Sequence, residues 1–366
     1  MSGTATERRI PFNSLAPGIR AIRGEIDAAI ARVLDSGWVL LGPELQAFEE
    51  AFAAYHGSGF RAVGVGSGTD ALTIGLRALG VGPGDDVLVV ANAGVPPAAA
   101  VVAAGARPVY CDVNASTHVM DPTEIDARVT PRTRAVLVVH LYGHPAPMPE
   151  IVKRARVHRL KVLEDCAQAH GARLDGQLVG TFGDAAAFSF YPTKNMGALG
   201  DAGALLTRDR ETAERAKLLR MYGWREKYIS ELQSTVSRMD ELHAAVLSIK
   251  LRHLDEWNAR RRAIAQQYRR GLDGMLDLPP SDGVFHLFVV QSTQRDALRA
   301  GLAQAGVGTD VHYPLPAHLQ KPYASDVQLP NTERLAQRVL SLPMYPELSD
   351  ADVDYIVEVI RARHGA

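Results

Sequence analysis

The sequence predicts an α/β protein, with a large and mainly parallel sheet followed by a smaller α+β C-terminal unit. Two observations lead to this prediction. Short apolar, β-branched runs alternate with helical patterns over the first two thirds of the chain, and strands this apolar are typical of a parallel sheet buried on both faces. A long, charged, amphipathic stretch then begins at Asp240, and a second series of elements follows the turn at 277–283.

The first unit should contribute most of the sheet. The apolar runs in this unit are too short to be buried helices. They are also rich in Val, Leu and Ala, which favours strands. An alanine-rich segment between the first two runs and the segment from Pro149 to Arg159 are expected to be helices. The predicted strands cover residues 86–91, 107–113, 135–143, 161–166, 184–190 and 202–207.

The stretch after Asp240 carries apolar residues at spacings of three and four, which predicts one long helix with a strongly basic end. Acidic residues are interleaved with the basic ones, so a solvated or inter-domain face is favoured over a nucleic-acid-binding helix. We place the domain boundary along this helix, with a large domain at 1–247, which includes the N-terminal segment, and a small domain at 248–366. The small unit should contain a strand at 284–292 and helices at 296–306, near Thr332–Leu340 and near Asp350–Arg363.

Composition narrows the classes of partner. The chain has 366 residues, 40 Lys and Arg, and 41 Asp and Glu, and this balance gives no reason to expect nucleic acid or an anionic membrane as a partner. Its only cysteines are Cys111 and Cys166, too few for a disulfide framework, which favours a reduced, cytoplasmic setting. The first ten residues lack the apolar stretch of a signal peptide, and the apolar run at 95–106 is too short to cross a bilayer.

A glycine-rich turn precedes a predicted helix at residues 64–80. Gly64, Gly66 and Gly68 come directly before Thr69 and Asp70. Such a turn presents free N–H groups at a helix N-terminus and can hold a phosphate. The third glycine of a dinucleotide fingerprint would fall at Thr69, and no P-loop lysine follows. An ordinary helix cap remains an equal alternative.

Asp165 is expected at the carboxyl end of a strand, where open α/β sheets bind ligands. A carboxylate at that position could keep a ring nitrogen protonated, and Gln168 follows three residues later. The alternative is a capping aspartate at the start of an ordinary loop.

Lys194 is the single lysine of FSFYPTKNMGALGDAGA, residues 188–204. Aromatic and glycine neighbours would desolvate its ammonium group, lower its pKa and make the free amine a nucleophile for an aldehyde. Ser189, on the preceding strand, could donate to a phosphate. A solvated loop lysine is the alternative. A phosphate-binding turn, a strand-end Asp and this Lys together fit pyridoxal 5′-phosphate (PLP).

These motifs resemble those of the DegT/DnrJ/EryC1/StrS family of sugar aminotransferases, which are fold-type-I PLP enzymes with a three-layer αβα large domain. The likeness covers nearly the whole chain. The matching stretches are 35–57, SGTDAL (67–72), HLYGHPAPM (140–148), EDCAQAHGA (164–172), SFYPTKNMGALGDAGA (189–204), 237–261 and LSLPMYPELSD (340–350).

The resemblance implies a role for each of six residues. Lys194 would attach the cofactor covalently, and Asp165 would pair with its pyridine nitrogen. Gln168 would hydrogen-bond the ring hydroxyl. The phosphate would be held by Gly68, Thr69 and Ser189.

The resemblance also implies a homodimer whose active site lies at the subunit interface, because residues 222–238 would reach the neighbouring subunit.

Two positions depart from the family pattern. Val236 stands where an asparagine usually contributes to the partner's phosphate site, so Ser234, Thr235, Ser237 or water must serve instead. The stretch 91–100 offers Pro96 and Pro97 but no aromatic residue to stack on the cofactor.

The loop at 309–324 contains His312, Tyr313 and His318. No third metal ligand shares a face with the two histidines, so no metal site is expected. Structural loop histidines are one alternative. The arrangement resembles that of family members acting at C3 of keto-sugars, in which these three residues would face the sugar or its diphosphate. The loop supplies no arginine for a substrate α-carboxylate.

The resemblance therefore implies a transaminase that takes its amino group from L-glutamate and delivers it to a nucleotide-linked keto-sugar, a dTDP-3-keto-6-deoxyhexose, with pyridoxamine phosphate formed between the two half-reactions. Amination at C4 and a non-catalytic regulatory protein of the same fold are the alternatives. The related PLP-dependent sugar dehydratases carry histidine in place of Lys194, which argues against that activity.

Overall fold

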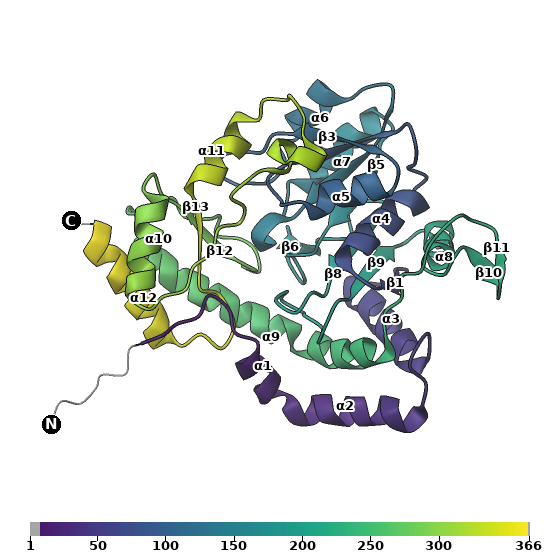
Figure 1. Cartoon of the computed structure of the whole chain (residues 1–366), viewed down its shortest axis with the longest axis horizontal. Coiled ribbons are helices and arrows are strands. Elements are labelled where there is room, and N and C mark those ends of the chain that lie inside the picture. The colour runs from purple at the N-terminus through teal and green to yellow at the C-terminus, as the bar shows by residue number, and fades with distance from the viewer. Residues whose placement is uncertain (1–7, 365–366) are drawn as a thin grey trace.

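The computed structural model describes residues 8–364, and its centre is a seven-stranded sheet with helices on both faces (Figure 1). The strand order is β1-β9-β8-β5-β4-β2-β3. β9 runs antiparallel to both of its neighbours, and the other pairs are parallel. The strands are β1 (Arg61–Val65), β2 (Asp86–Val90), β3 (Arg107–Cys111), β4 (Thr133–Val139), β5 (Lys161–Asp165), β8 (Ala185–Ser189) and β9 (Gly203–Thr207).

Different helices pack on the two sides of the sheet. Along β8, Ala185 and Ala187 belong to one hydrophobic cluster, while Ala186 and Phe188 belong to another, as the alternation of side chains along a strand requires. Helices α3 (Pro43–His56) and α9 (Glu241–Leu272) cover the face with Phe188, and α4 (Gly68–Ala78) packs on the opposite face against β8 and β9. This is the three-layer αβα arrangement that was expected.

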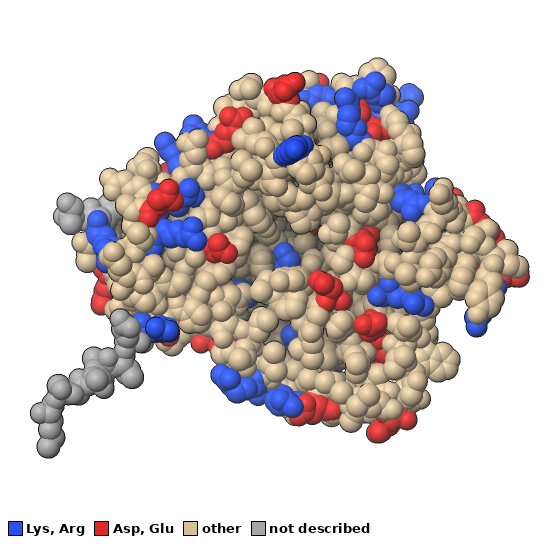
Figure 2. All heavy atoms as spheres, viewed as in Figure 1, with Lys and Arg blue, Asp and Glu red and all other residues tan. Residues whose placement is uncertain are grey.

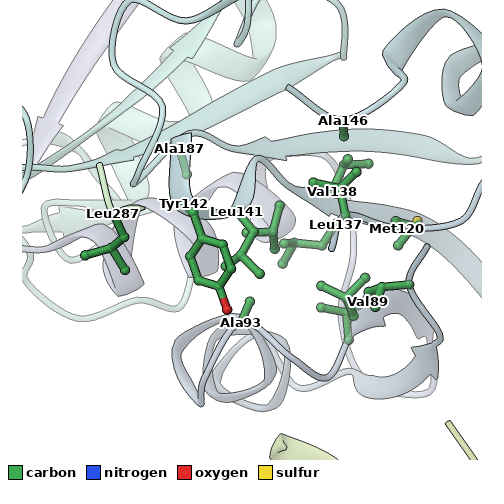
Figure 3. Close-up of a cluster of buried hydrophobic side chains, with 14 of the residues drawn as sticks. Val89, Ala93, Met120, Leu137, Val138, Leu141, Tyr142, Ala146, Ala187 and Leu287 are labelled. Atoms are coloured by element: carbon green, nitrogen blue, oxygen red, sulfur yellow. The ribbon is translucent and has the colours of Figure 1, made fainter. Parts of the chain in front are cut away.

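The larger core continues from the sheet into the C-terminal unit. Figure 3 shows Val89 of β2 and Leu137 of β4 in one cluster with Tyr142, Ala187 and Leu287. Each of these side chains is at most 5% exposed. Because Leu287 comes from the C-terminal part of the chain, burial of its side chain holds the two units together.

The C-terminal unit is built on α9, which is continuous over 32 residues. A boundary between residues 247 and 248 would fall inside this helix, and that division of the chain stays a prediction. Ile10, near the N-terminus, forms a parallel bridge with Val307 of the C-terminal unit. The other elements of the unit are β12 (Phe288–Gln291), β13 (Val339–Leu342), α10 (Arg295–Gln304), α11 (Pro330–Arg338) and α12 (Asp350–His364).

Two predicted elements end earlier than expected. The helix near Thr332–Leu340 stops at Arg338, because the next four residues are buried at every position and pair with β12 as β13. The strand at 135–143 stops at Val139, and residues 141–143 form a 3₁₀ turn in which Tyr142 has a φ of 60°.

The remaining elements include β1, which the sequence did not predict, and a two-stranded hairpin that projects from the body at the right of Figure 1. Over the face drawn in Figure 2, Lys and Arg side chains are interspersed with Asp and Glu. In the part of the chain that the structure describes, no helix is long and apolar enough to cross a membrane. The elements not yet named are α1 (Ala16–Ala21), α2 (Arg23–Ser36), α5 (Pro96–Ala103), α6 (Thr123–Arg128), α7 (Met148–Val157), α8 (Arg210–Leu219), β6 (Arg173–Leu174), β7 (Gln177–Leu178), β10 (Trp224–Glu226), β11 (Ile229–Ser230) and the 3₁₀ turns Leu141–Gly143, Ala317–Leu319 and Lys321–Tyr323.

A buried carboxylate joins the N-terminus of α3 to the first turn of α9. The Glu241 side chain is 0% exposed, and its oxygens accept the N–H groups of Gly42 (2.8 Å), Glu44 (2.8 Å) and Leu45 (3.2 Å). The first N–H groups of a helix have no partner within the helix. Glu241 supplies the acceptor and places negative charge at the positive end of the helix dipole.

We predict that Glu241→Ala lowers the free energy of unfolding by about 2 kcal/mol, because these N–H groups lose a charged acceptor. Glu241→Gln, which retains one acceptor oxygen, should lose less. Urea-induced unfolding followed by circular dichroism measures both. Glu256→Ala, at an exposed position of the same helix, is the control, and an equal loss in Glu256→Ala and Glu241→Ala would contradict the capping role.

Candidate active site

Asp165 ends β5 in the middle of the sheet, at the carboxyl edge of the parallel strands. Its register partners are Val139 on β4 and Ala187 on β8. The side chain is only 5% exposed, and its Oδ1 accepts the N–H of Ala167 at 3.0 Å. Burial raises the pKa of this carboxyl group, while the Ala167 N–H and the nearby charge of Lys194 oppose the rise.

Lys194 lies in the loop after β8, and its N–H donates to the carbonyl oxygen of Tyr191 at 2.8 Å. Gly197 is needed to close this loop, because a Cβ atom there would lie 2.2 Å from the carbonyl oxygen of Pro192. Burial lowers the pKa of Lys194 to about 8, and the Asp165 carboxylate limits that fall. The structure therefore brings the predicted amine and the predicted strand-end carboxylate within electrostatic reach of each other.

The N-terminus of α4 meets the end of β8 at Gly68. A Cβ atom at Gly68 would lie 2.4 Å from the Cβ atom of Ser189, so only glycine allows this approach. Ser67 caps the helix by accepting the N–H of Asp70 at 3.1 Å. The N–H groups of Gly68 and Thr69 belong to the first turn and have no acceptor within the helix. These two N–H groups and the Ser189 hydroxyl can therefore hold an anion.

A hydroxyl from the stretch before α9 supports the same turn. Ser237 Oγ accepts the N–H of Gly66 at 2.9 Å and donates to Asp70 Oδ2 at 2.8 Å. Ser237 is one of the alternatives, with Ser234, Thr235 and water, that the sequence left open as a replacement at Val236, but the sequence did not reveal its link to Asp70. Val236 itself is 40% exposed.

The side chain of Gln168 is held between the two units. Its Oε1 accepts the N–H of Tyr142 at 2.6 Å, and its Nε2 donates to the hydroxyl of Tyr313 at 3.2 Å. The Tyr142 hydroxyl in turn donates to the carbonyl oxygen of His312. These three hydrogen bonds fix the loop of the C-terminal unit against the edge of the sheet.

The ring of Tyr313 lies against Gly94, in the stretch 91–100. Gly94 has a φ of +74°, and a Cβ atom there would lie 3.2 Å from the Tyr313 ring. The sequence offered no aromatic residue in that stretch. The structure brings one to it from the C-terminal loop, next to Gln168.

The two loop histidines lie in different surroundings. His312 Nδ1 is 2.9 Å from Ser341 Oγ, and burial lowers the pKa of the ring, with the charge of Lys194 adding to the effect. His318 is 1% exposed and contacts Tyr110 and Glu333. The structure thus brings His312 and Tyr313 toward the lysine but places His318 in the interior, and a substrate contact for His318 stays a prediction.

Three buried side chains, His140, Glu164 and Cys166, have their ligand atoms within 4.8 Å of one another. They are unsuited to a metal because their donor atoms are already engaged. His140 accepts the N–H of Ala146 through Nδ1 (3.0 Å) and bonds Glu164 through Nε2 (3.0 Å). Burial raises the pKa of the Cys166 thiol far above its usual value. Glu164 also accepts three N–H groups, those of Gly180, Phe182 and Gly183.

The fold is a three-layer αβα arrangement around a mainly parallel sheet. Lys194, Asp165 and the first turn of α4 lie at the carboxyl edge of that sheet, and this combination is typical of a PLP-dependent transferase of fold type I. The residues fit what PLP requires from a protein, namely an amine for its aldehyde, a carboxylate for its ring nitrogen and N–H groups for its phosphate. The family model described as the DegT/DnrJ/EryC1/StrS aminotransferase family matches residues 20–361. The chain belongs to this family, whose enzymes use PLP.

Named relatives extend over almost the whole chain. A dTDP-3-amino-3,4,6-trideoxy-alpha-D-glucose transaminase from Streptomyces venezuelae is 47% identical, over 99% of this chain and 98% of that protein. The erythromycin biosynthesis sensory transduction protein EryC1 from Saccharopolyspora erythraea is also 47% identical, over 96% and 99%. The crystal structure of S. venezuelae DesV in complex with a ketimine intermediate has a TM-score of 0.94 at 47% identity and covers 98% of this chain and 99% of that one.

We predict that the amine of Lys194 in the cofactor-free protein becomes reactive as the pH rises through about 8. The Asp165 carboxylate stabilises the charged ammonium, so Asp165→Asn should move this midpoint to lower pH. Acetylation rates measured across a pH series by mass spectrometry give the midpoint. The rate at Lys153, exposed on α7, should be the same in both proteins. A midpoint that does not move would show that the two groups do not interact.

Proposed function

We propose that this protein is a transaminase that moves an amino group from L-glutamate to C3 of a nucleotide-linked keto-sugar, with a dTDP-3-keto-6-deoxyhexose as the substrate. The observation that carries the proposal is Lys194, a lysine with a lowered pKa beside a buried strand-end carboxylate. The name of the S. venezuelae relative, a transaminase for a dTDP-3-amino sugar, supports the substrate class and the position.

Lys194 acts first as the attachment point and then as the proton carrier. At pH 7, a pKa of about 8 leaves about a tenth of the side chain as free amine, whereas an ordinary lysine has only about one part in several thousand. Once the donor's amine has taken its place, the Nζ atom removes the proton from the α-carbon of glutamate. In the second half of the reaction Nζ delivers a proton to C3 of the sugar.

The other residues hold and polarise the cofactor. Bound PLP supplies an electron sink for the carbanion that forms when the proton leaves. Asp165 keeps the ring nitrogen protonated, and Gln168 bonds the ring hydroxyl. The phosphate binds to the N–H groups of Gly68 and Thr69 and to the hydroxyl of Ser189.

We assign recognition of the sugar or its diphosphate to His312, Tyr313 and His318. Support for the first two comes from their position beside Gln168 and their electrostatic coupling to Lys194 or Asp165. His318 is buried beneath this loop, so any part it plays requires the loop to move. The two cysteines are free and buried, and we place the protein in the cytoplasm.

Absorbance tests the catalytic reaction. Adding PLP should produce the visible band of lysine-bound cofactor, Lys194→Ala should abolish that band, and L-glutamate should bleach it in the wild-type protein. A regulatory role, suggested by the name of the EryC1 relative, predicts a band that L-glutamate leaves unchanged. Mass spectrometry of the products from 3-keto and 4-keto nucleotide sugars then locates the new amine, and amination at C4 alone would contradict the C3 proposal.

We further propose a homodimer in which the stretch 222–238 contacts the second subunit at its active site. The hairpin of β10 and β11 projects from the body (Figure 1). Its tip exposes Tyr228 (73%) and Ile229 (58%), and Val236 follows nearby with 40% exposure. Apolar side chains that are this exposed on a projecting element are typical of an interface.

We predict that replacing both Tyr228 and Ile229 with Asp converts the dimer to a monomer, because two carboxylates cannot be buried without partners. Light scattering after size-exclusion chromatography should show the mass falling to that of one chain. Val157→Asp changes an equally exposed apolar residue on α7 (74%) and should leave the mass unchanged. A double variant that remains a dimer would rule out the hairpin as the interface.

A further inference from the structure

A cavity of about 200 Å³ lies on one side of the Lys194 loop. Four segments form its wall, namely the N-terminal residues 13–19, the loop at 192–199, one face of α9 and residues 345–347. Asp165, Gln168 and Ser189 are not part of this wall. The cavity therefore adjoins the reactive lysine without being the pocket that these three residues assign to the cofactor.

Two buried cations of α9 line the cavity. Lys250 is 8% exposed and Arg261 is 4% exposed, and they lie about three helical turns apart on the same face of the helix. Burial lowers the pKa of Lys250 to about 8 and that of Arg261 to about 10, so both are predominantly charged at neutral pH. Buried cations are costly unless anions or hydrogen bonds compensate for them.

The protein compensates for these charges only in part. The Lys250 ammonium donates to the carbonyl oxygen of Gly197, which leaves two of its N–H groups for another acceptor. One amino group of Arg261 donates to the carbonyl oxygens of Phe285, His286 and Met344. The Nε atom of Arg261 is buried and has no acceptor among the described residues.

The acidic residue of the wall is Glu347. It is exposed, and it lies against α1, since a Cβ atom at Gly18 would come within 2.6 Å of its Oε1. Its charge acts on both cations and opposes the fall in their pKa values. Two buried cations therefore share the wall with one exposed carboxylate, and the cavity favours an anion.

The size of the cavity distinguishes the two anionic substrates of the proposed reaction. Pockets for drug-sized ligands measure about 300–1,000 Å³, so this cavity is too small for a whole nucleotide sugar but suits an amino acid. L-Glutamate has two carboxylates and one amino group, which would have to replace the amine of Lys194 on the cofactor. The loop at 309–324 contains no arginine to bind them.

Given the proposed transaminase function, we propose that this cavity binds the carboxylate groups of the amino donor, with Lys250 and Arg261 as their cationic partners. The donor enters between the N-terminal segment and residues 345–347, and its amino group faces the Lys194 loop. Charge-assisted hydrogen bonds of this kind are the strong ones in proteins. They give the protein a specific site for a dicarboxylic amino acid.

Binding of glutarate tests the proposal without turnover, because glutarate has both carboxylates of the donor but no amino group. Isothermal titration of the PLP-loaded protein should show binding of glutarate and none of its uncharged diamide. Lys250→Met should weaken glutarate binding by about tenfold or more, and Lys250→Arg should restore most of it. Arg252→Met, at an exposed position of α9, is the matched control and should bind as the wild type does.

The two half-reactions give a second measurement. In Lys250→Met the glutamate concentration that half-saturates bleaching of the visible band should rise by about tenfold or more, while the concentration of keto-sugar needed for the reverse change should stay the same. Glutarate binding that is absent in the wild type, or unchanged in Lys250→Met, would overturn the proposal. A rise for the keto-sugar alone would also overturn it and assign the cavity to the diphosphate. Failure of L-glutamate to bleach the wild-type band would instead contradict the transaminase function.

Discussion

The buried carboxylate of Asp165 and the partly exposed amine of Lys194 act on each other electrostatically, and the rest of the site is arranged around this pair. Burial raises the pKa of the acid and lowers that of the amine. The charge of each group opposes the shift in the pKa of the other. The sheet makes this possible, because β5 and β8 are adjacent and deliver the two residues to the same edge.

The same edge is completed by groups from distant parts of the chain. Tyr313 and His312 reach it from the C-terminal unit through hydrogen bonds to Gln168 and Tyr142. Ser237 reaches the glycine-rich turn before α4 from the stretch before α9. Because the bonds of His312 and Tyr313 cross between the two units, a shift of the C-terminal unit would move these two residues relative to Lys194.

Much of the fold and part of the site could be predicted from local patterns. Apolar runs predicted six of the seven strands of the sheet, with ends accurate to a few residues, and missed β1. Local patterns could not distinguish the last turn of a helix from β13, because Val339 and Leu340 suit either structure until β12 provides a partner. They also missed the turn at Tyr142, where an L-residue adopts a positive φ because the packing and hydrogen bonds around it hold it there.

The family, the class of sheet and the lysine expected to hold the cofactor could all be inferred from short stretches of chain, because the residue types in each stretch restrict its structure and chemistry. Other features became visible only in the tertiary structure. Gly94 makes room for the ring of Tyr313, and His318 is buried. Lys250 and Arg261 line a cavity beside Lys194. These contacts join residues far apart in the chain. They form only when the two units pack together, and local sequence patterns do not predict that packing.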